Sequence, residues 1–201
     1  MMRSLSGWMV MLGLILLMGC ASSSPPPIYY GLQTVPHQCD TPSRNQLTIG
    51  VGPVQLPEYL DRAAIVTRLS PNRLKVNDDR RWAGSLQNEI LRVLTTDLKI
   101  RTACGRVVAF PWESDVDPDI RIRVTIHAFE GRPGSQVRLQ ATWSMAQPSV
   151  SPAVLLRDCE VVEKVDGEDF ESLTAAMGRA LAVMSQEMAS TATAAQAPVK
   201  H

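Results

Sequence analysis

The clearest chemistry in the sequence lies near the start of the chain, at Cys20. Trp8–Met18 is an uncharged apolar run, shorter than the ~20 residues that a helix needs to span a bilayer. The small Gly19 precedes the cysteine, so Leu17–Cys20 resembles a site where a signal peptidase cuts and the thiol receives a diacylglyceryl group. We therefore predict that residues 1–19 are a lipoprotein signal peptide and that Cys20 is lipidated. The alternative is a signal anchor or buried helix that happens to contain cysteine.

The segment after this cysteine has the composition of a tether. Residues 20–27 read CASSSPPP, a polar, proline-rich stretch that cannot continue a helix. Several acyl chains on one cysteine anchor a protein stably, because each buried CH₂ contributes ~0.8 kcal/mol. Ala21 stands where an aspartate commonly retains lipoproteins in the inner membrane of Gram-negative cells, so in such a cell we expect the periplasmic face of the outer membrane. A folded domain is expected over 28–188 and a disordered tail over 189–201.

The three further cysteines leave room for one disulfide in an oxidising compartment. Cys39 lies in a proline-bounded loop and Cys104 follows a predicted helix, whereas Cys159 lies inside a predicted strand. Cys39 and Cys104 are therefore the better pair, although one sequence does not fix the connectivity. Since the chain has no CxxC or HxxxH spacing, we expect no metal site.

Catalytic chemistry is not indicated by the remaining polar residues. The histidines and serines form no recognisable nucleophile–base pattern, and no glycine-rich loop opens a helix to hold phosphate. The acidic pairs Asp78–Asp79 and Glu168–Asp169 are interpreted as favourable charges at helix starts. With 20 basic and 20 acidic residues the formal net charge is zero, which argues against nucleic acid as a partner. We expect no enzyme activity and no cofactor.

The elements that must position these residues follow from the hydrophobic pattern. Alternation is clearest at Asp119–Phe129 and Gln136–Met145, which flank a Gly/Pro turn and predict an antiparallel hairpin. Helical spacing predicts one helix from roughly Asp79 to Lys99, with Trp82 near its start, and a second from Asp166. Further strands are expected at Ile28–Val35, Gln46–Val54, Ala63–Leu69, Arg73–Val76, Val107–Phe110 and Val154–Val165. The predicted fold class is α+β: a mainly antiparallel sheet with two amphipathic helices packed on one face.

Two segments carry a resemblance to a known family. Tyr29–Leu32 (YYGL) is similar to the family's opening strand, and Ile49–Arg68 (IGVGPVQLPEYLDRAAIVTR) is similar to its most distinctive block. Arg81–Ala83 continues the match, whereas Ala63–Ala64 departs from the Pro-Gln that commonly follows LDR. On these motifs the sequence is identified as a member of the ABC-type transport auxiliary lipoprotein family.

The resemblance implies a role in transport. Members of this family sit at the outer membrane and work with MCE-domain membrane proteins, which carry lipid or other lipophilic molecules across the periplasm. The resemblance also implies a ring-shaped homo-oligomer that docks on such a partner, and no enzymatic activity is carried over. The residues expected to face a partner or a neighbouring subunit are Tyr29, Tyr30, Tyr59, Asp61 and Arg62. For the last three, a structural turn pinned by an Asp61–Arg62 pair is the other interpretation.

Two other functions remain open on the sequence. A free-standing lipid-binding lipoprotein would need an apolar cavity, and the methionines of the second helix give the one hint of it: Met177, Met184 and Met188. A methionine stripe that packs on the sheet is the simpler interpretation. An envelope hydrolase would need a catalytic constellation that the sequence does not supply.

Overall fold

Eight strands and two helices form the part of the chain that the computed structural model describes, residues 25–34, 47–102, 105–113 and 115–195. In chain order they are β1 (Ile28–Tyr30), β2 (Thr48–Gln55), β3 (Ala64–Ser70), β4 (Arg73–Trp82), α2 (Leu86–Arg101), β5 (Arg106–Ala109), β6 (Ile120–Gly131), β7 (Gln136–Gln147), β8 (Ser151–Lys164) and α3 (Phe170–Ala195). Neither of these helices is long and apolar enough to cross a membrane.

The strands form one mixed sheet, which shows that the expectation of a mainly antiparallel sheet is wrong. Four pairings are parallel: β1 with β4, β2 with β5, β2 with β6, and β3 with β6. The β3–β4 and β6–β7 hairpins and the β7–β8 pairing are antiparallel. Alternation of side chains reports which face of a strand is buried but not the direction of its neighbour, so the pattern identified strands without fixing their pairing. The α+β class is consistent with the structure.

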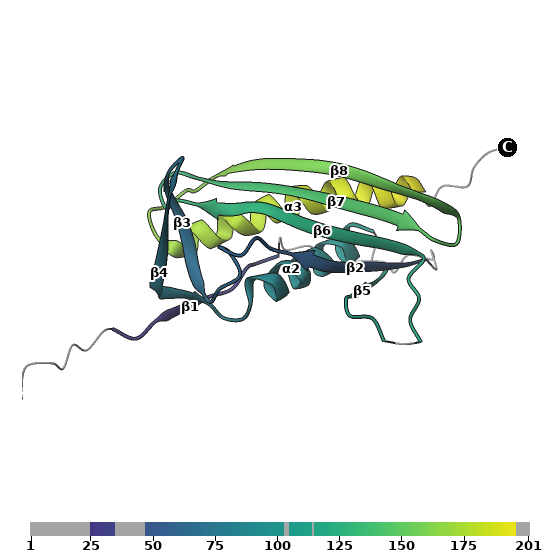
Figure 1. Ribbon diagram of the computed structural model, residues 1–201, viewed down its shortest axis with the longest axis horizontal. Coiled ribbons are helices and arrows are strands. Elements are labelled where there is room, and N and C mark those ends of the chain that lie inside the picture. Colours follow the sequence, from purple (N-terminus) through teal and green to yellow (C-terminus); the bar gives the residue numbers. More distant parts are fainter. Residues whose placement is uncertain (1–24, 35–46, 103–104, 114, 196–201) are drawn as a thin grey trace, which may run out of the picture.

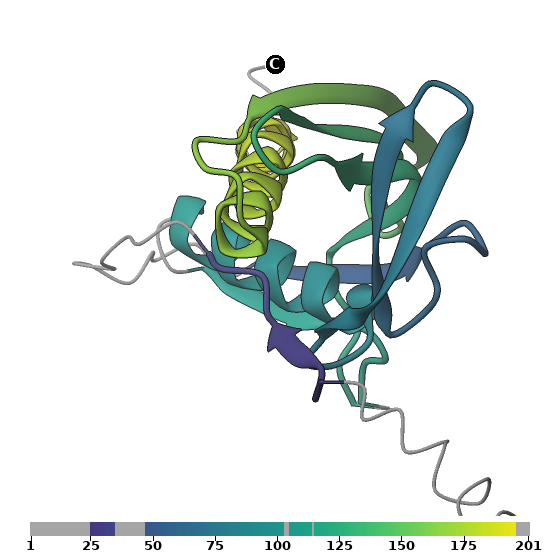
Figure 2. The ribbon, with the colours of Figure 1, turned by 90° about the vertical axis from the view of Figure 1, so that its left-hand side faces the viewer.

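Both helices lie on the inner side of the curled sheet, α2 against β2 and β5, and α3 against β7 and β8 (Figures 1 and 2). The core lies between these two layers. Its fully buried side chains include Ile90, Leu94 and Leu98 of α2, Ile120 and Ile122 of β6, Leu139 and Trp143 of β7, and Leu173, Leu181 and Met184 of α3. Burial of each large apolar side chain contributes ~1.5–3 kcal/mol, so this layer supplies most of the driving force for folding.

The first helix begins later than its sequence signal predicts. Ser85 is the N-cap of α2, and its hydroxyl accepts a hydrogen bond from the amide of Asn88 at 3.2 Å. The acidic pair Asp78–Asp79 lies instead in β4, whose last residue is Trp82. The reason is tertiary: Asn77 is buried and its amide donates to the carbonyl of Ile65 across the hairpin, at 2.9 Å. The segment that contains the Asp78–Asp79 pair is therefore held in a strand pairing rather than at a helix start.

The second helix begins at Phe170, later than the predicted start at Asp166, and it runs further than predicted. Asp169 caps α3 by accepting a hydrogen bond from the amide of Ser172 at 2.7 Å, which lowers the pKa of the Asp169 carboxyl. The helix continues to Ala195, past residue 189 where the tail is expected to begin. Ala189 and Ala192 are buried, so this extension packs on the body of the domain.

The strands β1, β4 and β3 form a separate leaf of the sheet, which we call the N-terminal leaf. Within the described residues, it joins the rest of the sheet through a single parallel pairing between Thr67 and Gly131. Figure 2 shows the β3–β4 hairpin standing beside the curl formed by the other strands. Tyr29 of β1 and Ala64 of β3 both pair with Arg81 of β4, so the two segments that carry the family resemblance meet at one end of this leaf.

Candidate functional site

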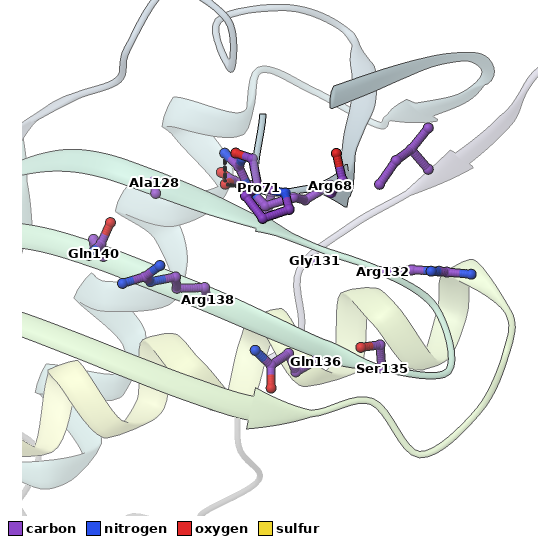
Figure 3. A pocket seen from close by; sticks show the side chains of 12 residues that line it. Arg68, Pro71, Ala128, Gly131, Arg132, Ser135, Gln136, Arg138 and Gln140 are labelled. Atoms are coloured by element: carbon purple, nitrogen blue, oxygen red, sulfur yellow. Dashed lines mark hydrogen bonds and ion pairs between the residues drawn. The ribbon is translucent and has the colours of Figure 1, made fainter. Parts of the chain in front are cut away.

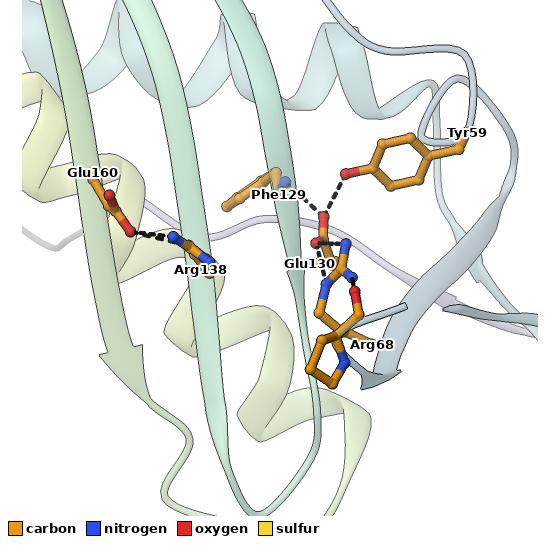
Figure 4. Close-up of polar contacts among 7 residues, drawn as sticks. Tyr59, Arg68, Phe129, Glu130, Arg138 and Glu160 are labelled. Carbon is orange, nitrogen blue, oxygen red and sulfur yellow. Dashed lines mark hydrogen bonds and ion pairs between the residues drawn. The ribbon is translucent and has the colours of Figure 1, made fainter. Parts of the chain in front are cut away.

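The block Ile49–Arg68 forms β2, a tight turn and β3. The turn is closed by backbone hydrogen bonds, from the amide of Leu60 to the carbonyl of Pro57 at 2.9 Å and from the amide of Arg62 to the carbonyl of Leu60 at 2.8 Å. The side chain of Leu60 is buried in the core and anchors the turn to the domain. Its neighbour Tyr59 points to a polar cluster under the N-terminal leaf (Figure 4).

The centre of this cluster is the buried carboxylate of Glu130, at the end of β6. Its Oε2 accepts hydrogen bonds from the hydroxyl of Tyr59 at 2.6 Å and from the amide of Phe129 at 3.0 Å. Its Oε1 accepts from Nε and Nη2 of Arg68, at 2.7 and 2.6 Å. Burial, together with the hydrogen bond to Glu130, raises the pKa of Tyr59 well above its usual range. One carboxylate thus ties the turn, β3 and β6 together.

A bulge in β6 explains why the sequence pattern misses Glu130. Ile126 pairs with Ala141, but Ala128 pairs with Gln140, so one extra residue, His127, is inserted into β6. Beyond the bulge the alternation reverses, and the side chain of Phe129 enters the core while that of Glu130 points to the opposite face. A straight strand would keep Ala128 on the core face with Ile126. The sequence signal that accompanies the bulge is a charged residue, Glu130, at the next position of the apolar alternation that includes Ile126 and Ala128.

The predicted interface residues do not play equal parts. Tyr29 is 60% exposed, whereas Tyr30 is half-buried and its ring lies 5.9 Å from that of Phe170. Tyr59 is engaged internally by the Glu130 carboxylate. Asp61 and Arg62 are exposed, and within the described residues neither forms an ion pair or a side-chain hydrogen bond. The turn is therefore pinned by Tyr59 and its backbone rather than by an Asp61–Arg62 pair.

The chain that follows β1 is fastened between the two helices. The amide of Leu32 donates to Oε2 of Glu89 at 3.0 Å, and Nη2 of Arg92 donates to the carbonyl of Leu32. Arg92 and Glu89 also pair with each other at 2.8 Å, and the Leu32 side chain is buried. On the other side, α3 approaches so closely that a Cβ at Gly178 would lie 2.6 Å from the carbonyl oxygen of Gln33. We call this arrangement the Leu32 clamp.

A groove of about 550 Å³ lies beside the Glu130 cluster, between the β3–β4 hairpin and the outer face of the β6–β7 hairpin (Figure 3). Arg68 and Pro71 form one wall, and Arg138 and Gln140 of β7 lie on the other. Arg132 and Ser135 lie at the hairpin end of the groove. Three of the lining side chains are arginines and one is a glutamate, so the groove carries an excess of positive charge.

The outer sheet face carries a polar row that does not assemble a nucleophile. Nε2 of His127 lies 2.8 Å from the hydroxyl oxygen of Thr142, and that hydroxyl donates to Oδ1 of Asp158 at 2.8 Å. A catalytic arrangement would place the histidine between the hydroxyl and the carboxylate. Here Thr142 separates the two, so the carboxylate does not orient the imidazole.

The cysteines divide into one described residue and three that lie outside the described part. Cys159 is a buried free thiol in β8, and burial raises its pKa. Cys20, Cys39 and Cys104 lie outside the described residues. Lipidation at Cys20 and a disulfide between Cys39 and Cys104 therefore remain predictions.

This chain is similar in sequence to one set of known proteins and similar in fold to a second set of solved structures. Residues 30–189 match the family described as the ABC-type transport auxiliary lipoprotein component. Two relatives, each named intermembrane transport lipoprotein PqiC and found in Escherichia coli (strain K12) and Shigella flexneri, are 27% identical over 137 residues, 68% of this chain and 72% of theirs.

Among solved structures, an uncharacterized protein aligns with a TM-score of 0.70 at 18% identity, covering 84% of this chain and 99% of its own. The protein XCC0632 from Xanthomonas campestris aligns with a TM-score of 0.63 at 17% identity, covering 85% of this chain and 100% of its own. At these identities the two structures show a shared fold. Because the family match extends over most of the sequence, the chain belongs to the ABC-type transport auxiliary lipoprotein family.

Proposed function

We propose that this protein is a lipid-anchored, non-catalytic accessory subunit of an MCE-type intermembrane transport system. The observation that carries the proposal is the family match over residues 30–189, with relatives named as intermembrane transport lipoproteins. In this proposal Cys20 holds the chain at the periplasmic face of the outer membrane, and the proline-rich tether separates the anchor from the domain. The partner is an MCE-domain membrane protein that brings the cargo.

We propose that the end of the N-terminal leaf is the contact surface. Asp61 and Arg62 are exposed there, on a turn whose position is fixed from inside by Tyr59. The exposed Tyr29 belongs to the same end, because its partner Arg81 also pairs with the start of β3. A rigid turn that presents exposed side chains is suited to docking, since little conformational freedom is lost on binding. The same surface would contact the neighbouring copy in a ring-shaped homo-oligomer.

The test is capture of the partner from solubilised membranes. The full chain, carrying a C-terminal affinity tag, is expressed in its own cell, recovered in mild detergent, and its bound proteins are identified by mass spectrometry. We expect an MCE-domain protein, and we expect the double variant Asp61→Lys, Arg62→Glu to lose it. The matched control is Lys75→Glu, an exposed charge elsewhere on the leaf. Failure of the unaltered chain to recover any MCE-domain protein would contradict the proposal.

The competing idea of a free-standing lipid carrier loses the one feature that suggested it. Met177, Met184 and Met188 are buried, each 1% exposed or less, in the core cluster where α3 packs against β7 and β8. The simpler interpretation of the methionine stripe is thus confirmed. Native mass spectrometry of the detergent-extracted chain would revive the carrier hypothesis if it showed one lipid bound per chain at a defined site.

A further inference from the structure

We propose that the groove between the β3–β4 and β6–β7 hairpins binds the phosphate group of a phosphate ester. The proposal rests on the proposed function only in naming a lipid headgroup as one source of that ester. The chain as a whole has a formal net charge of zero, whereas the groove is lined by Arg68, Arg132 and Arg138 against the single carboxylate of Glu130. The positive charge is therefore local to this cavity.

The first arginine is held in place with donors to spare. Of the five N–H donors of a guanidinium, Arg68 uses Nε and Nη2 on Glu130 and Nη1 on the carbonyl of Pro71, at 2.7 Å. Two N–H groups remain, and the Arg68 side chain is 35% exposed. The buried carboxylate thus fixes a cation at the wall of the groove before any ligand arrives. Such preorganisation lowers the entropic cost of binding.

The other two arginines are available to a ligand. Arg132 is exposed, and within the described residues its guanidinium has no hydrogen-bond or ion-pair partner. Arg138 pairs with Glu160 at 2.6 Å, but about half of each side chain is exposed, and pairs of this kind contribute little. Glu160 does not line the groove. A phosphate that met Arg132 and Arg138 would replace water and a weak surface pair with charge-assisted hydrogen bonds.

The size and lining of the groove favour an ester over a bare ion. Its volume of about 550 Å³ falls within the range of roughly 300–1,000 Å³ that is typical of sites for small organic ligands. Besides the arginines, Ser135, Gln136 and Gln140 supply hydroxyl and amide groups that suit a glycerol or sugar moiety. The planar fork of arginine can donate two parallel hydrogen bonds to the oxygens of one phosphate, as it can to those of a carboxylate. A phospholipid headgroup and a soluble phosphate ester share this chemistry.

The experiment is calorimetric titration of the full chain in nonionic detergent. The probes are inorganic phosphate, glycerol 3-phosphate, and dihexanoyl phosphatidylglycerol below its own micelle concentration. We expect saturable binding of the esters, tighter than that of inorganic phosphate and weakened by added salt. A lipid that binds at least tenfold tighter than glycerol 3-phosphate assigns the site to a headgroup, and equal affinities assign it to a soluble ester. Absence of saturable binding for all probes overturns the proposal.

Variants locate the binding in the groove. Arg132→Gln and Arg138→Gln should each weaken the preferred ester by about tenfold, the loss typical of one hydrogen bond to a charged group. Glu160→Gln should tighten binding of the ester two- to fivefold, because this substitution frees Arg138 from its ion pair. Arg123→Gln is the matched control, an exposed arginine of β6 outside the groove, and should leave affinity unchanged. Equal binding by all four variants and the unaltered chain would overturn the site even if an ester binds.

The same variants separate this inference from the proposed function. Arg132→Gln and Arg138→Gln leave the Asp61–Arg62 turn untouched and should still capture the MCE-domain partner. Capture without ester binding would reject the groove and keep the accessory role. Ester binding without capture would reject the accessory role and keep the groove.

Discussion

Phe129 and Glu130 are neighbours on β6, both are buried, and they belong to two different kinds of interior. Phe129 faces the helices, in a core made almost entirely of apolar side chains. Glu130 faces the other way, under the N-terminal leaf, where hydrogen bonds from Tyr59 and Arg68 take the place of apolar contacts. The first interior tolerates exchange of one apolar group for another, whereas the second depends on a few groups that cannot be exchanged. The family's distinctive block lies over the second.

The largest expected effect tests the apolar side of this comparison. Phe129→Ala should lower the free energy of unfolding by about 3–5 kcal/mol, because it removes buried surface and leaves a cavity in the core. Urea unfolding followed by circular dichroism measures the loss. The control Val150→Ala, at a residue 79% exposed, should change stability by less than about 0.5 kcal/mol. A loss below 1 kcal/mol at Phe129 would mean that this face is not the main core.

The next effect tests the polar side. Glu130→Gln should cost about 2–3 kcal/mol, because it removes the charge that balances Arg68 and disturbs the hydrogen bonds from Tyr59 and Phe129. The cost stays below that of a fully buried pair, since Arg68 reaches solvent. Glu160→Gln is the matched control in an exposed pair and should cost less than about 1 kcal/mol. Equal losses from the two variants would contradict the central place given to Glu130.

A smaller effect isolates the turn. Tyr59→Phe should cost about 1 kcal/mol, the net value of one hydrogen bond, because Oε2 of Glu130 keeps its hydrogen bond from the amide of Phe129. The same residue has a spectroscopic signature, because its raised pKa requires one phenol to ionise above the usual range of tyrosine. Ultraviolet titration of the unaltered chain should show this late step, and the Tyr59→Phe variant should lack it. A variant that keeps the late step would place the shifted phenol elsewhere.

The smallest expected effect concerns Asp97, which lies between the helices, and it is a dependence of the free energy of unfolding on pH. Asp97 is buried in α2, Oδ2 has no hydrogen-bond partner in the described part of the chain, and burial raises the pKa of its carboxyl despite the nearby Arg101. The folded state therefore binds the proton more tightly than the unfolded state, so stability falls as pH rises through the folded pKa. Asp97→Asn should remove this fall. Urea unfolding between pH 4 and pH 8 should show the free energy of unfolding of the variant increasing relative to that of the unaltered chain as pH rises. Parallel curves would show that Asp97 is not the source of the pH dependence.

The sequence predicts the apolar interior better than the polar one, for a physical reason. Alternation over Gln136–Met145 and helical spacing over Leu86–Leu98 report burial directly, and both elements are confirmed. Pairing direction and the start of α2 depend on contacts between distant residues, such as Asn77 with Ile65, and local patterns do not contain them.

The candidate site shows the same limit. The Ile49–Arg68 block is visible in the sequence, but the residue that holds its turn, Glu130, lies far along the chain beyond a bulge. Tyr59 is found by the resemblance as an interface residue, whereas the structure engages it internally. Exposure of Asp61 and Arg62 fits the interface hypothesis, and the contact itself remains a prediction.

The Leu32 clamp has a mechanical consequence if the chain is held by Cys20. A load on the tether first meets β1, whose three residues pair with the end of β4. If β1 separates from β4, the load reaches Leu32, whose amide is hydrogen-bonded to Glu89 and whose carbonyl is hydrogen-bonded to Arg92. Releasing three residues adds about 10 Å of reach at ~3.3–3.6 Å per residue, without opening the domain. The clamp thus allows the tether to lengthen by the length of β1 while the fold of the domain stays intact.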